Sequence, residues 1–575
     1  MRVVQGVSAS PGMAHGKAVV YLPQELSFQP HSVTDTRAEA DRLSNAVESA
    51  IDELVRLKER VLKEMGEEFA HIFRSQQTIL EDDSIIGEVK EKIAEEKWCA
   101  EEAVRQVFTA YLEMFEELGD DDYNKARLAD LEDVHKRLLR NLLGKAEVDL
   151  SDLAERTVIV AQELYPSDTA VMNTDQVCGM ITERGGITSH VAILAKNLGV
   201  PAAVAVPDAT KAISENDEIY LDATDPDEAR VYINPDGTRL RRLEEERRRH
   251  EERRKVLTEE KKLEPVTPDG RRITVSVNIG SVEEIESARA NGAKSVGLFR
   301  SEFLFMKGKI LPDEEKQFEA YKRAVEAFPE GFVILRTLDI GGDKPVESIS
   351  IPEEENPFLG YRAVRISLAK PALFKQQLRA ALRASVFGTL KVMFPMVSGP
   401  NEVNSILQLL TEVRRELDNE GVSYDPEMEV GIMVEIPSAV FMADELLEGI
   451  DFMSIGTNDL TQYLLAADRM NENIREYYQP FHPAVFRAIA RVVDAAHARG
   501  KWVGVCGELG GMPLAMPALL GLGVDELSMS PQTVPEAIHT IRHVRYESAR
   551  ELAGRLLRMS EEPEIKELLR KAAPE

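Results

Sequence analysis

The sequence predicts a multidomain α/β protein, in which a small α/β domain with an inserted helical bundle is followed by a (β/α)8 barrel. Three observations support this prediction. Short strand-like segments at the N-terminus are separated by a long helical stretch from similar segments further on. A highly charged helical segment comes next. Eight short apolar segments then alternate with helical ones over residues 264–575, about the length that one barrel requires.

The small α/β domain is predicted from two separated parts of the chain. Residues 3–21 read as two short strands around an SASPG turn, too short to form a sheet alone. Strand-like segments return over residues 150–232, as RTVIVAQEL, QVCGMITERG, PAAVAV and DEIYLDA. The simplest interpretation is that the two parts pair, and we assign residues 1–21 and 146–235 to one domain.

Residues 22–145 repeat charged and apolar residues at helical spacing, which predicts a bundle of about four long helices. An acidic run in this bundle is more typical of a solvated face than of a docking site; it comprises Glu113, Glu116, Glu117, Asp120, Asp121 and Asp122. Residues 236–263 are polar nearly all round, with opposite charges three and four positions apart. This pattern predicts an exposed linker helix.

The barrel prediction depends on strands that are continuously apolar, as parallel strands buried on both faces are. The eight segments are RITVSVNI, KSVGLFRSEF, GFVILRTLDIGG, TLKVMFPMVS, EVGIMVEIP, DFMSIGTNDL, KWVGVCGEL and DELSMS. Because the active site of such a barrel lies where the strands end, polar residues at those ends are candidates for function.

The strand ends carry residues suited to phosphate and metal chemistry: Arg300, Arg336, Glu435, Asn458, Asp459, Cys506 and Glu508. Each alone has a structural explanation, but together they are poorly explained as scaffold. Arginine forks bind phosphate and carboxylate oxygens. Two carboxylates, Glu435 and Asp459, are the oxygen-only set that Mg²⁺ accepts. Arg469 could reach the same anion, so the barrel predicts a magnesium site for a small, doubly anionic metabolite.

A second candidate is a histidine in the stretch ITERGGITSHVAILAKNLGVP. Two glycines allow a tight turn, Thr188 or Ser189 can cap a helix that begins at or near His190, and Gly199 and Pro201 end that helix. A helix N-terminus disfavours imidazolium and favours an attached anion, which suits a neutral ring that carries phosphate. A histidine that merely caps or packs is the alternative.

Composition excludes several classes of protein. The formal net charge of −30 argues against a nucleic-acid surface. Cys99, Cys178 and Cys506 are too far apart for a disulfide framework or a CxxC metal site. No GxxxxGK[ST] loop for nucleotide phosphates is present. No segment is apolar enough to span a bilayer, and MRVVQGVSASPG lacks a signal-peptide core, so we expect a cytoplasmic protein.

Seven motifs, in order along essentially the whole chain, resemble the enzyme I family of the bacterial phosphoenolpyruvate-dependent sugar phosphotransferase system. They are GGITSH, GLFRSEFLFM, RTLDIGGDKP, NPFLGYRAVR, GIMVEIPSAV, SIGTNDLTQYLLAADR and GVCGELGG. GGxTSH alone would also fit pyruvate phosphate dikinase and phosphoenolpyruvate synthase. Several separate motifs in register make the resemblance specific.

The resemblance implies a set of roles for matching residues. His190 would be phosphorylated through Nε2, with Thr169 orienting its ring. Cys506 would protonate C3 of the departing enolate to give pyruvate, while Glu435 and Asp459 would ligate Mg²⁺. The residues expected to bind phosphoenolpyruvate are Arg300, Arg336, Asn458, Asp459, Arg469 and, as assisting residues, Arg362 and Lys344.

The resemblance also implies partners and motion. The helical bundle would dock the histidine carrier HPr, the barrel would form a homodimer, and the phosphohistidine domain would swivel between barrel and HPr. A dikinase or synthase needs an ATP-binding domain, for which the chain has no room. A non-catalytic regulatory protein is the other alternative, and the intact candidate residues argue against it.

Three positions depart from the family pattern. Ile187 stands where an arginine is usual in GGRTSH, and Met512 stands where an aspartate often follows CGE. Gln76 replaces a histidine common in the bundle before LED, which bears on how this bundle would grip HPr. None of these departures removes a residue assigned to chemistry.

Overall fold

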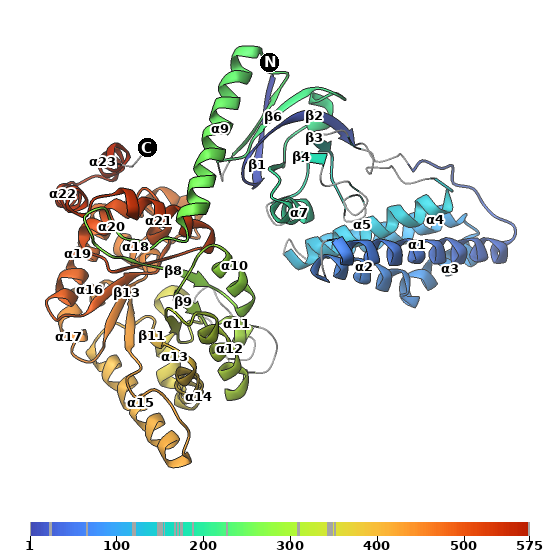
Figure 1. The fold of residues 1–575 in the computed structure, drawn as a ribbon. Helices are drawn as coiled ribbons and strands as arrows, with labels where there is room; N and C mark the ends of the chain where they lie inside the picture. The colour runs from blue at the N-terminus through green and yellow to red at the C-terminus, as the bar shows by residue number, and fades with distance from the viewer. Residues whose placement is uncertain are drawn as a thin grey trace. The chain divides into compact units, whose positions relative to one another are not determined.

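The computed structural model divides into two compact units, residues 1–250 and 251–575 (Figure 1). It describes residues 2–21, 26–64, 67–117, 122–145, 156–165, 176–186, 189–225, 228–306, 311–341 and 354–572, together with residues 153, 168, 172, 349 and 352. Within these residues, no helix combines the length and the apolar character needed to cross a membrane.

The first unit contains a closed seven-stranded sheet in the order β1-β5-β4-β3-β2-β6-β7. Its strands are β1 (Arg2–Ser10), β2 (Met13–Tyr21), β3 (Thr157–Ala161), β4 (Val177–Thr182), β5 (Ala202–Val204), β6 (Glu218–Asp222) and β7 (Ala229–Ile233). As inferred from the sequence, the N-terminal strands pair with the later ones: β1 with β5 and β7, and β2 with β3 and β6. The strand β7 was not predicted, because ARVYI is short and carries an exposed arginine.

The helical bundle has five described helices instead of about four: α1 (Thr36–Glu64), α2 (Glu67–Leu80), α3 (Asp83–Glu96), α4 (Ala100–Glu117) and α5 (Asp122–Leu142). Residues 67–96 form two helices because Asp82 caps a new one. Its carboxylate accepts a hydrogen bond from the amide of Ser84 at 2.8 Å. A capping residue inside a charged, periodic stretch is easily read as part of one helix.

Side-chain hydrogen bonds lie both at the side of the bundle that faces the seven-stranded sheet and inside the bundle. On the side of the seven-stranded sheet, Lys136 Nζ donates to the Tyr165 hydroxyl at 2.6 Å, and that hydroxyl donates to Glu132 Oε2 at 2.5 Å. Inside the bundle, the fully buried Gln76 donates from Nε2 to Asp133 Oδ2 at 2.9 Å. The departure at Gln76 therefore lies in the bundle core. Of the acidic run, the side chain of Glu113 is described, and it is exposed.

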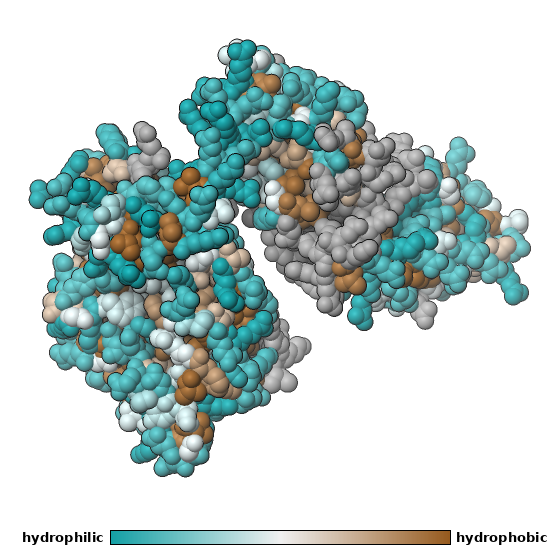
Figure 2. Space-filling model, in the orientation of Figure 1, coloured by the Kyte–Doolittle hydropathy of each residue, from teal (hydrophilic) through white to brown (hydrophobic). Residues whose placement is uncertain are grey.

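The predicted linker helix is α9 (Gly237–Glu260). Asp236 accepts hydrogen bonds from the amides of Thr238 and Arg239 at its start, and Leu243 is the buried residue within it. Figure 2 shows mostly hydrophilic residues along this helix. A helix that is polar nearly all round gains little from packing, so its stability depends on its ends and on ion pairs along its surface.

The second unit is a closed barrel of eight parallel strands, and all eight predicted segments are confirmed. The strands are β8 (Thr274–Ile279), β9 (Val296–Arg300), β10 (Val333–Arg336), β11 (Leu390–Phe394), β12 (Val430–Val434), β13 (Phe452–Ile455), β14 (Trp502–Val505) and β15 (Glu526–Met529). Nearly every residue in them is buried, which explains why their sequences are apolar without alternation. The predicted (β/α)8 architecture is correct.

Helices surround this barrel (Figure 1). They are α10 (Ile285–Ala290), α11 (Phe303–Met306), α12 (Glu314–Ala327), α13 (Val364–Ala369), α14 (Pro371–Ala384), α15 (Pro400–Glu420), α16 (Pro437–Phe441), α17 (Ala443–Leu446), α18 (Thr457–Leu465), α19 (Pro483–His497), α20 (Met516–Leu522), α21 (Val534–His543), α22 (Tyr546–Leu556) and α23 (Glu562–Ala572). In the first unit, α7 (His190–Leu198) and α8 (Ala209–Ala212) accompany the seven-stranded sheet.

Candidate active site

The C-terminal ends of the barrel strands carry the predicted polar residues. Arg300 and Arg336 are the last residues of β9 and β10, and Glu435 follows β12 directly. Asp459 lies in the first turn of α18, after β13, and Cys506 follows β14 directly. Parallel strands bring all these ends to one rim, which is where barrels of this kind place their active sites.

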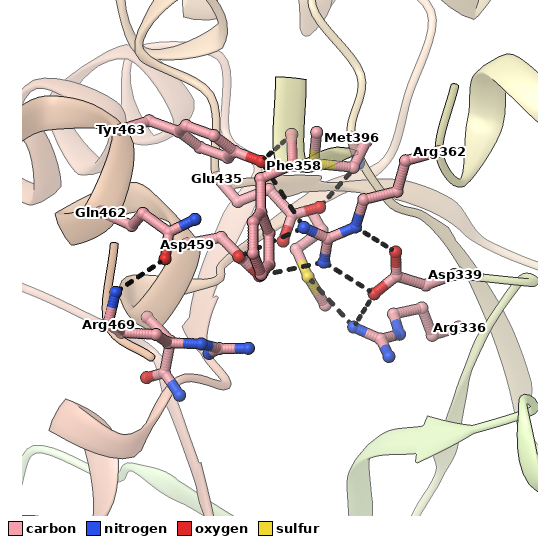
Figure 3. Close-up of polar contacts among 12 residues, drawn as sticks. Arg336, Asp339, Phe358, Arg362, Met396, Glu435, Asp459, Gln462, Tyr463 and Arg469 are labelled. Carbon is pink, nitrogen blue, oxygen red and sulfur yellow. Dashed lines mark hydrogen bonds and ion pairs between the residues drawn. The ribbon is translucent and has the colours of Figure 1, made fainter. Parts of the chain in front are cut away.

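Two buried arginines at this rim are joined through carboxylates (Figure 3). Arg336 contacts Glu302 Oε1 at 2.6 Å and Asp339 Oδ2 at 3.0 Å. Arg362 contacts Asp339 Oδ1 at 3.0 Å and Asp459 Oδ2 at 3.3 Å. The network fixes two guanidinium groups within a buried part of the rim, and guanidinium groups are suited to bind phosphate and carboxylate oxygens.

Electrostatics keep both arginines charged. Burial alone would lower the pKa of Arg336, but Glu302 and Asp339 outweigh it and raise that pKa. For Arg362 the same balance holds, with Asp339 and Asp459 raising the pKa against burial. Both guanidinium groups therefore stay charged, each in contact with two carboxylates.

Glu435 is a buried acid with an unused oxygen. Its Oε1 accepts a hydrogen bond from the amide of Met396 at 2.6 Å, whereas its buried Oε2 has no partner among the described residues. Burial, together with the negative charges of Asp459 and Asp339, raises the pKa of Glu435 to about 8. An unpartnered carboxylate oxygen beside a second carboxylate fits a divalent cation, which would bind both and relieve their repulsion.

Three further predicted residues lie around the same end of the barrel. Asn458 Nδ2 donates to Glu508 Oε1 at 2.9 Å, and the amide of Glu508 donates back to Asn458 Oδ1 at 2.9 Å. This reciprocal pair connects the start of α18, after β13, to the segment that follows β14. The amide of Arg469 donates to Gln462 Oε1 at 3.1 Å, which fixes its backbone beside α18 (Figure 3).

Cys506 is a buried thiol. Its side chain is 3% exposed, and its Sγ lies 3.7 Å from the carbonyl oxygen of Ile455. Burial raises the pKa of this thiol to about 12. Cys506 is therefore a protonated thiol at neutral pH, able to give up a proton but poorly suited to act as a thiolate nucleophile.

Comparison with known proteins identifies the chain. A family model described as "PEP-utilising enzyme, PEP-binding domain" matches residues 254–546, where PEP is phosphoenolpyruvate. The corresponding N-terminal and mobile-domain models match residues 5–127 and 153–225. A phosphoenolpyruvate-protein phosphotransferase of Haemophilus influenzae is 41% identical over 569 residues, covering 99% of this chain and 98% of its own. The chain belongs to this phosphotransferase family.

Two other phosphoenolpyruvate-protein phosphotransferases agree. That of Staphylococcus carnosus is 41% identical over 566 residues, and that of Bacillus subtilis is 40% identical over 565 residues. Each covers 98% of this chain and 98% of its own length. The family resemblance seen in the motifs is confirmed, and the chain is an enzyme of the phosphoenolpyruvate-utilising class.

The family's histidine motif has the backbone predicted for it. His190 is the first residue of α7, and the Ser189 side chain accepts a hydrogen bond from the amide of Ala192 at 3.4 Å as the N-cap. Gly185 has a φ of +99°, which requires glycine in the turn before the helix, and Gly199 ends the helix with a φ of +64°. The His190 side chain, Thr169, Ile187 and Lys344 lie outside the described residues.

Sequence reasoning missed two carboxylates of this phosphotransferase. Glu302 and Asp339 hold Arg336, and neither was among the predicted site residues. Both stand within three residues of a strand end, which was the available signal. Met512, one of the three residues that depart from the family pattern, is partly buried and packs against the barrel core, so its side chain has a structural role.

Proposed function

We propose that this enzyme transfers the phosphoryl group of phosphoenolpyruvate to its own His190 and then to a histidine of HPr, releasing pyruvate, as the first step of the sugar phosphotransferase system. The observation that carries the proposal is the buried rim network of Arg336, Arg362, Asp339, Asp459 and Glu435. It combines fixed positive charge for a small anion with a carboxylate pair that fits a divalent cation.

In the barrel, the arginines, Asn458 and Lys344 would bind phosphoenolpyruvate. Arg300 and Arg336 would hold the phosphate, with Arg469 and Asn458 completing the cradle, and Arg362 and Lys344 would assist. The exposed end of Arg300 and the buried one of Arg336 belong to neighbouring strands, which supports a shared ligand. Mg²⁺ held by Glu435 and Asp459 would supply charge neutralisation for the leaving enolate.

Cys506 would complete the chemistry on the pyruvate side. When the phosphoryl group leaves, the electron pair of the broken P–O bond remains on the enolate oxygen, and C3 must take a proton to yield pyruvate. A thiol whose pKa is about 12 is fully protonated before the step and can supply that proton.

His190 would carry the phosphoryl group between partners. Its position at the start of α7 favours an attached anion through the helix dipole and the free amides of the first turn. Thr169 would orient the ring, the bundle would dock HPr, and the barrel would form a homodimer. We place this reaction in the cytoplasm, where the protein is expected from its sequence.

One labelling experiment tests the central step. The enzyme is incubated with Mg²⁺ and ³²P-labelled phosphoenolpyruvate in the absence of ATP, and acid-labile label on the protein is measured. Wild type should take up label and pass it to added HPr, whereas His190→Ala should take up none. His250→Gln, an exposed histidine on α9, serves as the matched control. Label that is absent from wild type, or that survives His190→Ala, contradicts the proposal.

A further inference from the structure

Two histidines and a glutamate meet where α9 contacts α21. His539 and His543 lie one turn apart on α21, with ring centroids separated by 4.2 Å, and Glu260 is the last residue of α9. Glu260 Oε2 lies 2.7 Å from His539 Nδ1, and its Oε1 lies 3.7 Å from His543 Nε2. One ligand atom from each residue lies within 4.8 Å of the others, so the three side chains enclose a common point.

The hydrogen bonds around His543 leave a nitrogen available to a metal. His543 Nδ1 lies 2.8 Å from the carbonyl oxygen of His539, so that nitrogen carries the proton and donates it. In the neutral ring, Nε2, on the side of Glu260, is then the nitrogen without a proton. A histidine that binds a metal through one ring nitrogen usually donates a hydrogen bond from its other ring nitrogen, often to a backbone carbonyl. His543 has this arrangement, with Nε2 facing the point shared by the three side chains.

A simple ion pair explains only part of this arrangement. Elsewhere in the same unit, His497 Nε2 contacts Asp525 Oδ2 at 2.8 Å, and this ion pair contains a single imidazole. Here a second imidazole faces the same carboxylate. Two protonated rings at 4.2 Å would repel each other, whereas two neutral rings can share a cation.

Helix geometry also favours a cation at this point. Glu260 ends α9 and His543 ends α21, so the negative ends of two helix dipoles converge there. The last turn of α9 contains no basic residue. The neighbouring cations Lys261 and Arg542 are directed to backbone carbonyls, those of Ala290 at 2.7 Å and Glu264 at 2.9 Å. The dipole of α9 is thus left to be offset by another positive charge.

We propose that Glu260, His539 and His543 bind one Zn²⁺, which fastens the C-terminal end of α9 to the barrel helix α21. Two imidazole nitrogens and one carboxylate are a zinc ligand set, and histidines four apart on a helix supply two ligands from one face. The side chains of Glu260 and His539 are 18% and 12% exposed, whereas His543 is 46% exposed. The exposed edge admits water as the fourth ligand. This site is separate from the rim that binds substrate, and it does not depend on the proposed function.

Calorimetry on the full-length, metal-free enzyme tests the site. Zn²⁺ is titrated at about pH 7.5, where neutral histidine is available as a ligand, with Mg²⁺ present in excess to occupy the carboxylates of the rim. Wild type should bind one Zn²⁺ per chain at this site. Binding should weaken about tenfold or more in Glu260→Gln, since even the loss of a supporting residue costs that much, and should vanish in His539→Asn/His543→Asn.

The matched control is His497→Asn, which removes a histidine from an ion pair that has no second imidazole, and it should bind Zn²⁺ as wild type does. Two further readouts separate a metal site from a structural ion pair. Co²⁺ should give wild type an intense visible spectrum that His543→Asn lacks. Zn²⁺ should raise the melting temperature of wild type but not of His543→Asn, whose half-exposed position leaves the metal-free fold intact. Zinc binding that is absent from wild type, or undiminished in the double variant, overturns the proposal.

Discussion

Asp339 Oδ1 lies 3.0 Å from Arg362 Nε, and the two side chains are 0% and 1% exposed. The other oxygen of the same carboxylate contacts Arg336 at 3.0 Å. One buried acid therefore sets the positions of two guanidinium groups at the rim. Preorganised charge of this kind does not have to reorganise when substrate arrives, which is the main source of electrostatic catalysis.

Replacing Asp339 by asparagine should destabilise the barrel. The change leaves Arg336 and Arg362 buried with one carboxylate contact fewer, and breaking a buried ion pair from one side costs about 3–5 kcal/mol. Urea unfolding followed through Trp502, in a Trp98→Phe background, reports the barrel because the chain has two tryptophans. The control Asp494→Asn, on the exposed face of α19, should shift stability by less than about 0.5 kcal/mol. Equal shifts in both variants would show that Asp339 has no special role.

Glu435→Gln should abolish the stabilisation that Mg²⁺ gives the enzyme. A ligand that binds only the folded state stabilises it by mass action, so wild type should melt at a higher temperature as Mg²⁺ is added. The control is Glu526→Gln. Glu526 opens β15 at the opposite end of the barrel and is equally buried, and burial raises its pKa to about 8 as well. If Glu526→Gln lost the Mg²⁺ response and Glu435→Gln kept it, the assignment of the metal site would be wrong.

Cys506→Ala should slow pyruvate formation while leaving phosphoenolpyruvate binding unchanged. A positioned general acid contributes about 10²–10⁴-fold to rate, so a loss of that size in turnover is expected. Stopped-flow measurement of pyruvate release, with substrate affinity from calorimetry, separates the two effects. Cys178→Ala, in the first unit, should change neither. A parallel loss of binding and turnover in Cys506→Ala would make this thiol a packing residue.

Two partly buried groups in the bundle should give opposite pH dependences. Burial, then Lys136 and Arg105, lowers the pKa of His135 to about 4, and burial raises the pKa of Asp130 to about 6. Between about pH 4 and 6.5, His135 binds more protons in the unfolded state than in the folded state. This histidine therefore makes the free energy of unfolding rise with pH, by up to about 1.4 kcal/mol per pH unit. Between about pH 4 and 6, Asp130 binds more protons in the folded state than in the unfolded state. This aspartate therefore makes the free energy of unfolding fall as pH rises.

Single variants should therefore reveal slopes that partly cancel in wild type. In Asp130→Asn, bundle stability should rise with pH over this window. In His135→Phe, whose new ring can stack on Phe108 as the imidazole does at 5.3 Å, it should fall. Trp98 fluorescence during urea unfolding, in a Trp502→Phe background, follows the bundle. Slopes of the same sign in the two variants would refute the assignment.

The sequence predicted the barrel well because each of its strands carries its own signal. A segment such as GIMVE is apolar without alternation and ends in a charged residue, so both the burial of β12 and the rim position of Glu435 follow from local pattern. The residues at the strand ends could be named for the same reason. The contacts of these residues could not be predicted, since Asp339 joins Arg336, at the end of β10, to Arg362, which lies 23 positions beyond Asp339 in the sequence.

Other features escaped prediction because they depend on distant pairing or on a single residue. The break between α2 and α3 rests on one cap at Asp82. The burial of Gln76 depends on α5, more than fifty residues away. The meeting of Glu260 with His539 joins positions that no spacing rule connects. In each case the missing information is three-dimensional packing, which local periodicity does not contain.

The two N-terminal strands follow one another closely, yet β1 pairs with β5 and β7 and β2 pairs with β3 and β6. All four partners begin after residue 156, and the bundle lies between them and β2. On a ribosome that adds about 5–20 residues per second, the first strands would wait about 7–27 s for a neighbour. All five described helices of the bundle are synthesised before β3, so the bundle can form in that interval. The order of synthesis thus lets the bundle fold first, whereas the sheet of the domain that contains His190 can close only after β3 to β7 have been made.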